Sequence, residues 1–190
     1  MPPKQRITRD MILDQSFAMF EREGMDAVNA RSIAKALNCS TQPIFSYFSG
    51  MEDLKKALDQ RAWDSFEESV ACKGAGKPSV QSVCNAYVRF AGEQPRLFLH
   101  LFMRNGSALQ GVMLSEELRQ SVAEQESAAS ELSVTQARQL CNALWVHAHG
   151  LAAARAAGLF KITDKSVAEW LDKFREGEVL RLKGETEGVA

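Results

Sequence analysis

Four polar side chains, those of Thr41, Gln42, Ser46 and Tyr47, lie within seven residues of each other, with no charged residue between them. A glutamine amide can form two hydrogen bonds to adenine, a threonine methyl can contact the thymine methyl group, and hydroxyl groups can bind phosphates. If this segment is a helix, its N-terminus adds backbone N–H donors and a positive dipole end. These residues therefore predict close contact with the bases and backbone of duplex DNA.

Three short helices are expected to position this segment. The first follows Thr8, a suitable N-cap, and ends at Gly24. The second is capped by Asn29, and the third by Ser40, with Pro43 in its first turn. The apolar positions recur at helical spacing and predict one shared core. The expected core residues are Ile12, Leu13, Ser16, Phe17, Phe20, Ile33, Ala34, Leu37, Ile44, Phe45 and Phe48.

A tight turn, Asn38-Cys39-Ser40, joins the second and third helices. Asparagine tolerates the left-handed backbone that such a turn needs. A supporting helix, a sharp turn and a projecting helix make up a helix-turn-helix, which we place at residues 29–48 with 40–48 as the reading helix. The alternative is a three-helix core with no role in DNA binding, in which Tyr47 is an aromatic at the core edge.

Residues 8–58 resemble the N-terminal domain of the TetR family of transcriptional regulators. The shared positions, in order, are Phe20-Glu-Arg-Glu-Gly24, Ile33-Ala34, Cys39-Ser40, Ile44-Phe45, Tyr47-Phe48 and Glu52-Asp53-Leu54. The resemblance implies an all-α chain in which a helix-turn-helix DNA-binding domain precedes a helical domain for effector binding and dimerisation. The residues expected to contact DNA are Arg31, Ser40, Thr41, Gln42, Pro43, Ser46 and Tyr47.

Two positions depart from the family pattern. Phe45 stands where the family usually has tyrosine, and Met51 stands where it usually has lysine. Both usual residues help to hold the DNA backbone, and each lost cationic phosphate contact lowers the salt dependence of binding by about one unit. The cations that could compensate are Lys4, Arg6, Arg9, Lys55 and Lys56.

The rest of the chain also has helical periodicity. Helices are expected at about residues 51–71, 79–91, 95–104, 115–130, 134–157 and 164–182, with a frayed tail from Lys183. The clearest loop is Lys73-Gly-Ala-Gly-Lys-Pro78. We expect two domains, a DNA-binding domain over residues 1–52 and an effector-binding and dimerisation domain over residues 53–190.

The sequence at residues 145–150, Trp-Val-His-Ala-His-Gly, resembles the Trp…His-Gly signature of one C-terminal domain type in the same family. The candidates for lining an effector pocket are Phe66, Phe98, Phe102, Trp145 and His149. The alternative is that the aromatics are ordinary core and His149 is a packed, hydrogen-bonded residue.

Two apolar stripes in the last two helices suggest a four-helix dimer interface. Its candidates are Leu144, Ala148, Leu151, Trp170 and Phe174. The alternative is that these residues form the core of a single chain.

One helix-turn-helix reads about four or five base pairs, so a palindrome read by a homodimer, with reading helices ~34 Å apart, is expected. The predicted function is a cytoplasmic repressor of operator DNA that an unknown small-molecule effector releases. The alternative is a protein-interaction adaptor that has lost operator binding. Met51 and a near-neutral DNA-binding region, six basic against five acidic residues in the first 50, favour this alternative.

Several other classes of protein are not expected. The net charge is −1, so DNA affinity cannot rest on bulk charge. The four cysteines lack a CxxC spacing and are expected to be free thiols. On a helix, His147 and His149 point about 200° apart and cannot share a metal. We expect no enzyme, cofactor, metal site, secretory signal or membrane span.

Overall fold

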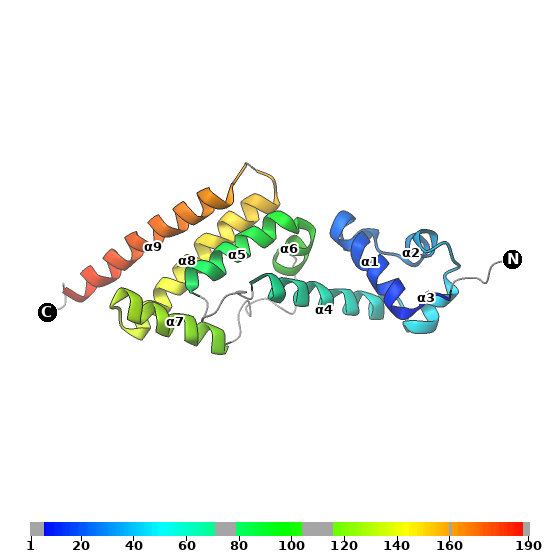
Figure 1. Cartoon of the computed structure of the whole chain (residues 1–190), viewed down its shortest axis with the longest axis horizontal. Coiled ribbons are helices and arrows are strands. Elements are labelled where there is room, and N and C mark those ends of the chain that lie inside the picture. The colour runs from blue at the N-terminus through cyan, green and yellow to red at the C-terminus, as the bar shows by residue number, and fades with distance from the viewer. Residues whose placement is uncertain (1–5, 71–78, 104–115, 160, 188–190) are drawn as a thin grey trace. The chain divides into compact units, whose positions relative to one another are not determined.

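The structure, a computed structural model, describes residues 6–70, 79–103, 116–159 and 161–187. Apart from a short 3-10 turn, every regular element in these ranges is an α-helix, which confirms the predicted fold class (Figure 1). The chain divides into two compact units. Described residues 6–66 and 96–103 form the N-terminal unit, and the other described residues form the C-terminal unit.

The N-terminal unit holds α1 (Arg9–Glu23), the 3-10 turn η1 (Met25–Ala27), α2 (Ala30–Ala36) and α3 (Gln42–Tyr47). Most of α4 (Met51–Val70) and nearly all of α6 (Pro95–Phe102) belong to it as well. Helix α4 continues without a break through residues 52 and 53, and the first compact unit extends to Phe66.

The ends of α1 follow from its terminal residues. The Thr8 hydroxyl accepts a hydrogen bond from the backbone N–H of Met11, which confirms Thr8 as the N-cap. Gly24 ends the helix at φ +93° and ψ 167°, a backbone conformation that is essentially restricted to glycine. The conformation is not the left-handed helical one that the sequence suggested, but it requires glycine for the same reason, the absence of a Cβ.

Helix α6 completes the core of the N-terminal unit. Its residues Leu97, Phe98 and Leu101 are buried. His100 packs edge-on against Phe20 of α1, with ring centroids 4.8 Å apart, and its Nε2 lies 2.7 Å from Oδ1 of Asp59 in α4. The core of this unit therefore combines residues that precede α5 in the sequence with residues that follow it.

The C-terminal unit contains α5 (Val80–Glu93), α7 (Glu116–Ser130), α8 (Val134–Ala156) and α9 (Asp164–Glu187). Helices α5, α7 and α9 all pack on α8. Helix α9 runs antiparallel to α8, because Asp164 pairs with Arg155 near the end of α8 while the Leu182 carbonyl accepts a hydrogen bond from Gln136 near its start. No helix in the described ranges has the length and apolar character needed to cross a bilayer.

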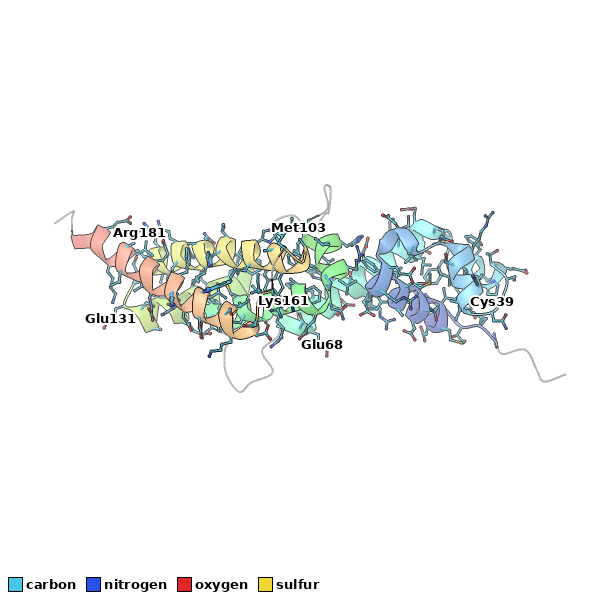
Figure 2. All side chains as sticks on the ribbon, turned by 90° about the horizontal axis from the view of Figure 1, so that it is seen from above. Cys39, Glu68, Met103, Glu131, Lys161 and Arg181 are labelled. Carbon is cyan, nitrogen blue, oxygen red and sulfur yellow. The ribbon has the colours of Figure 1, made fainter. Side chains whose placement is uncertain are left out.

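The expected frayed tail is wrong for residues 183–187, which continue α9. Leu182 is fully buried, and its carbonyl oxygen lies 2.8 Å from the Gln136 amide nitrogen. Lys183 pairs with Glu131, which Figure 2 shows near Arg181 at the same end of the unit. A Gly- and Glu-rich composition suggested fraying, but α9 continues through the segment, and tertiary contacts of Leu182 and Lys183 fix the position where it begins.

A buried ion pair joins α7 to α9. Glu126 is 5% exposed and accepts hydrogen bonds from the Arg175 guanidinium and from the Ser130 hydroxyl. Arg175 also donates to Ser130 Oγ at 2.6 Å. A charge buried to this extent needs its partner, because removal of one member leaves the other desolvated and unpaired.

We predict that Arg175→Met lowers the free energy of unfolding by about 3 kcal/mol, because it leaves the Glu126 carboxylate buried alone. The double variant Glu126→Gln/Arg175→Met should recover most of that loss in urea unfolding. Lys183→Met, which breaks an exposed pair, is the control and should change stability by less than about 1 kcal/mol. A double variant no more stable than Arg175→Met would contradict the coupling.

Candidate functional site

The helix-turn-helix is formed by α2 and α3. The side chain of Asn29 accepts a hydrogen bond from the Ser32 backbone N–H at 3.0 Å, as expected for the cap of α2. Asn38 has φ +51°, the predicted left-handed turn residue. The chain then closes the turn with a hydrogen bond of 2.9 Å from the Cys39 N–H to the Ala34 carbonyl. The sharp reversal between the two helices is therefore built by local bonds.

The start of α3 differs from the prediction. The helix begins at Gln42 with Thr41 as its N-cap, and no side chain caps it. Ser40, expected as the cap, is exposed one residue further out. Because Thr41 has a helical backbone conformation, its carbonyl accepts the first helical bond from the Ile44 N–H.

Two residues hold α3 against the rest of the unit. Ile44 is fully buried and Phe48 is 2% exposed. The Arg9 guanidinium lies over the Phe48 ring, 4.9 Å from its centroid, and so links α3 to the start of α1. These contacts fix which side of the short helix faces outward.

The sequence-based expectation that Phe45 is core is wrong, since its side chain is 50% exposed. Periodicity misled here because a helix this short has room on its inner side for only two large residues, Ile44 and Phe48. Phe45 therefore joins Gln42 and Ser46 on the outward side of α3.

The residues predicted to contact DNA lie together on α2, the turn and α3. Arg31, Ser40, Gln42, Ser46 and Tyr47 are exposed, and Thr41 and Pro43 are half-buried. The Ser46 hydroxyl donates to the Gln42 carbonyl at 3.0 Å, so its lone pairs point to solvent as acceptors. The Tyr47 hydroxyl donates to the Ile7 carbonyl at 3.3 Å, and a phosphate contact would require exchange of this bond.

Two of the five cations that could compensate for Met51 contact other residues of the chain, whereas Arg6 and Lys56 are exposed. Met51 opens α4, where the carboxylate of Asp53 accepts a hydrogen bond from the Ser49 N–H at 3.0 Å. Lys55 pairs with Glu52 at 3.2 Å. Arg9 stacks on Phe48, and Lys4 lies outside the described residues. The junction of α3 and α4 therefore offers backbone groups at its first residues, and the exposed cation of α4 nearest to it is Lys56.

Comparison with known proteins agrees with this geometry. Residues 12–58 match the family model of bacterial regulatory proteins of the TetR family, and residues 80–174, half of the chain, match the model of the tetracyclin repressor-like C-terminal domain. The chain belongs to the TetR family. It is thus a helix-turn-helix, DNA-binding transcriptional regulator and not an enzyme.

Individual relatives are distant. An uncharacterized HTH-type transcriptional regulator of Bacillus subtilis, YobS, is 26% identical over 99 residues, about half the length of either protein. TetR-family regulators of known structure from Rhodococcus sp. RHA1 and Streptomyces coelicolor share the fold, with TM-scores of 0.60 and 0.62 at 20% and 19% identity. The matches cover 90% and 93% of this chain and 96% and 88% of theirs.

The expected effector-pocket residues of this TetR-family chain fall into two clusters. Phe66, Phe98 and Phe102 pack on one another in the N-terminal unit, with Phe66–Phe102 and Phe98–Phe102 centroids 4.9 and 5.3 Å apart. Phe66 and Phe98 are almost completely buried there. Trp145 and His149 lie in the C-terminal unit, both against Tyr87 of α5.

Tyr87 and His149 form a partly buried polar contact. The hydroxyl of Tyr87 lies 2.8 Å from Nδ1 of His149. Burial raises the pKa of Tyr87 far above its usual value and lowers the pKa of His149, so both groups are uncharged near neutral pH and the tautomer of His149 sets which of them donates. His147 instead stacks on Phe174 of α9, with centroids 4.4 Å apart, which confirms that the two histidines point in different directions.

Leu144 and Ala148, expected at the dimer interface, have no exposed surface in the single chain and belong to its core. The apolar stripe predicted for α8 is present, but it marks the side of α8 that packs on other helices of the same chain. Leu151 and Phe174 are half-buried, and Trp170 is exposed. The apolar residue that projects most from α8 is Val146, and that of α9 is Leu180.

Sequence reasoning missed a group of buried amides in the C-terminal unit. Gln81 Nε2 and Oε1, Asn85 Oδ1 and Gln125 Nε2 are shielded from solvent, with no hydrogen-bond partner among the described residues. Gln81 and Asn85 are four residues apart and share one side of α5, while Gln125 lies on α7, which contacts α5. Polar residues in amphipathic helices are normally assigned to solvent, so the sequence gives no signal for them.

Proposed function

We propose that this TetR-family regulator is a repressor that binds a palindromic operator as a homodimer and is released by a small molecule. The observation that carries the DNA-binding part is the outward side of α3, where Gln42, Phe45 and Ser46 are exposed and no charge is present. Such a surface can approach base edges closely without a layer of solvated lysines. Binding to operator DNA would place the protein in the cytoplasm.

The residues have separable roles in this proposal. The Gln42 amide reads a base, with adenine as its natural partner because the amide matches the adenine N6 and N7 positions. Arg31, Tyr47 and the backbone near residues 49–51 hold phosphates and set the register. Because the outward side of α3 carries no charge and Met51 stands where a lysine is usual, affinity should depend on salt less steeply than is usual for a protein with many lysine contacts.

Operator selection from random duplexes followed by titration tests the repressor proposal. We expect the palindromic duplex to bind at least about 10³-fold more tightly than a scrambled one at physiological salt. Gln42→Ala should cost about 1–3 kcal/mol per half-site and relax the preference at one base pair. Equal affinity for palindromic and scrambled duplexes would reject operator binding and favour the adaptor.

The dimer would form on the outward sides of α8 and α9. Val146 and Leu180 are 71% and 72% exposed, and Trp170 is 39% exposed. Gly150 and Gly177 lie within these helices, and a Cβ at either would meet nothing in the same chain. Glycine inside a helix costs about 1 kcal/mol relative to alanine. Close approach of a second backbone at these positions would account for both glycines.

We predict that Leu180→Glu raises the dimer dissociation constant at least about tenfold, because two carboxylates would lose water at the interface. Gly177→Ala should also weaken the dimer, although a methyl group has room there in the single chain. Leu159→Glu, at a leucine 70% exposed between α8 and α9, is the matched control. Analytical ultracentrifugation measures all three, and equal effects of Leu159→Glu and Leu180→Glu would contradict this interface.

The effector is proposed to bind in the C-terminal unit through hydrogen bonds to the unpartnered amides. A similar solved structure, that of the multidrug binding protein EbrR, is described as a complex with imidazole, and its TM-score is 0.52 at 17% identity. For this chain, Gln81, Asn85 and Gln125 favour a polar ligand with donors and acceptors. Trp145 and His149 are proposed to belong to the Trp…His-Gly domain type and to support α5 through Tyr87.

We predict that Gln81→Met stabilises the ligand-free protein by about 1 kcal/mol, because it removes a buried amide without a partner. The same variant should lose its response to any compound that releases the operator from the wild-type protein. Gln60→Met, at an exposed glutamine bonded to Asp64, should leave stability within about 0.5 kcal/mol and keep the response. Destabilisation by Gln81→Met in thermal unfolding would show that the amide is already satisfied.

A further inference from the structure

The side chain of Phe45 is half exposed in a place where exposure brings no benefit to the fold. It is 50% exposed, while Ile44 and Phe48 on the other side of α3 are buried. Tyr47, the other large exposed residue of the helix, has its hydroxyl tied to the Ile7 carbonyl. The Phe45 side chain has no polar atom, so its exposure to water is unfavourable and no hydrogen bond to water compensates for it. The ring is therefore available to a partner that approaches the outward side of α3.

The position of the ring is fixed by the core. Ile44 and Phe48 are four residues apart and anchor one side of the helix. Gln42 and Phe45 are three residues apart and therefore neighbours on the other side. A partner that contacts the Gln42 amide also contacts the Phe45 ring, and the two side chains would contact adjacent positions on that partner.

The chemistry of the ring limits what it can recognise. Phenylalanine cannot bind a phosphate by a hydrogen bond, as a tyrosine at this position could. In the major groove, the apolar group that base pairs present is the thymine C5-methyl. Because Gln42 suits adenine, contact with a methyl group by its neighbour would favour A·T pairs at successive positions.

We propose that Phe45 is a specificity-determining residue that reads the thymine 5-methyl group beside the base pair read by Gln42. This inference rests on the proposed operator binding and adds that thymine is one of the bases read. A single methyl group is a small contact, and its burial corresponds to about a fourfold change in affinity per half-site. Two half-sites give about fifteenfold.

Replacement of thymine by deoxyuridine removes the methyl group and leaves the base pairing unchanged. An operator is first selected from random duplexes with wild-type protein. Duplexes in which single thymines are replaced by deoxyuridine in both half-sites are then titrated by fluorescence anisotropy against wild type, Phe45→Ala and Ser46→Ala. At one symmetric position, wild type should bind the deoxyuridine duplex about fifteenfold more weakly.

Phe45→Ala should bind the two duplexes equally, whereas Ser46→Ala should keep the wild-type ratio. An unchanged ratio in Phe45→Ala, or no thymine position that matters to the wild type, would overturn the assignment while operator binding stands. Failure of the wild type to select any duplex would instead overturn the proposed operator binding, and the assignment with it. Since Phe45 is outside the core, a melting temperature of Phe45→Ala near that of wild type is expected.

Discussion

The DNA-binding surface depends on the burial of two side chains, Ile44 and Phe48. A helix of six residues is too short to be stable alone, because helix nucleation costs more than so few hydrogen bonds return. Helix α3 exists because these residues are buried in the N-terminal unit, where α3 packs on α1. Since they lie on one side of the helix, they also determine which residues project. The core thereby sets the orientation of every group that could reach a base.

The absence of charge on α3 has a second consequence. Proteins that bind DNA mainly through lysine and arginine gain affinity for any sequence along with the correct one. Here the outward side chains of α3 are an amide, a hydroxyl and a phenyl ring, and nearby Lys55 and Arg9 interact with other residues of the chain. Discrimination between sequences would therefore rest on short-range contacts. Two copies would be needed to reach a useful affinity, so dimerisation matters for binding as well as for symmetry.

The sequence predicted what local rules control. The fold class, the caps at Thr8 and Asn29 and the turn at Asn38 follow from short-range preferences and are confirmed. The errors arise where tertiary packing decides. Phe45 fits a helical apolar pattern but is half exposed, Leu144 faces its own chain, and α9 continues past the buried Leu182 through residues 183–187. The buried amides were missed because polarity alone indicates solvent. The DNA, effector and dimer roles of the candidate residues remain predictions.

Helix α6 is encoded after α5, yet it supplies buried residues and the His100 contact to the core of α1 and α4. The DNA-binding unit is consequently not a contiguous piece of the gene. A hybrid regulator made by joining residues 1–52 to a foreign effector domain would pack the core residues of α1 against an α6 from another protein. Recombination among relatives should therefore preserve the pairing of these segments more strictly than their separation in the sequence suggests, and the reading helix and effector domain would be expected to evolve as one inherited unit.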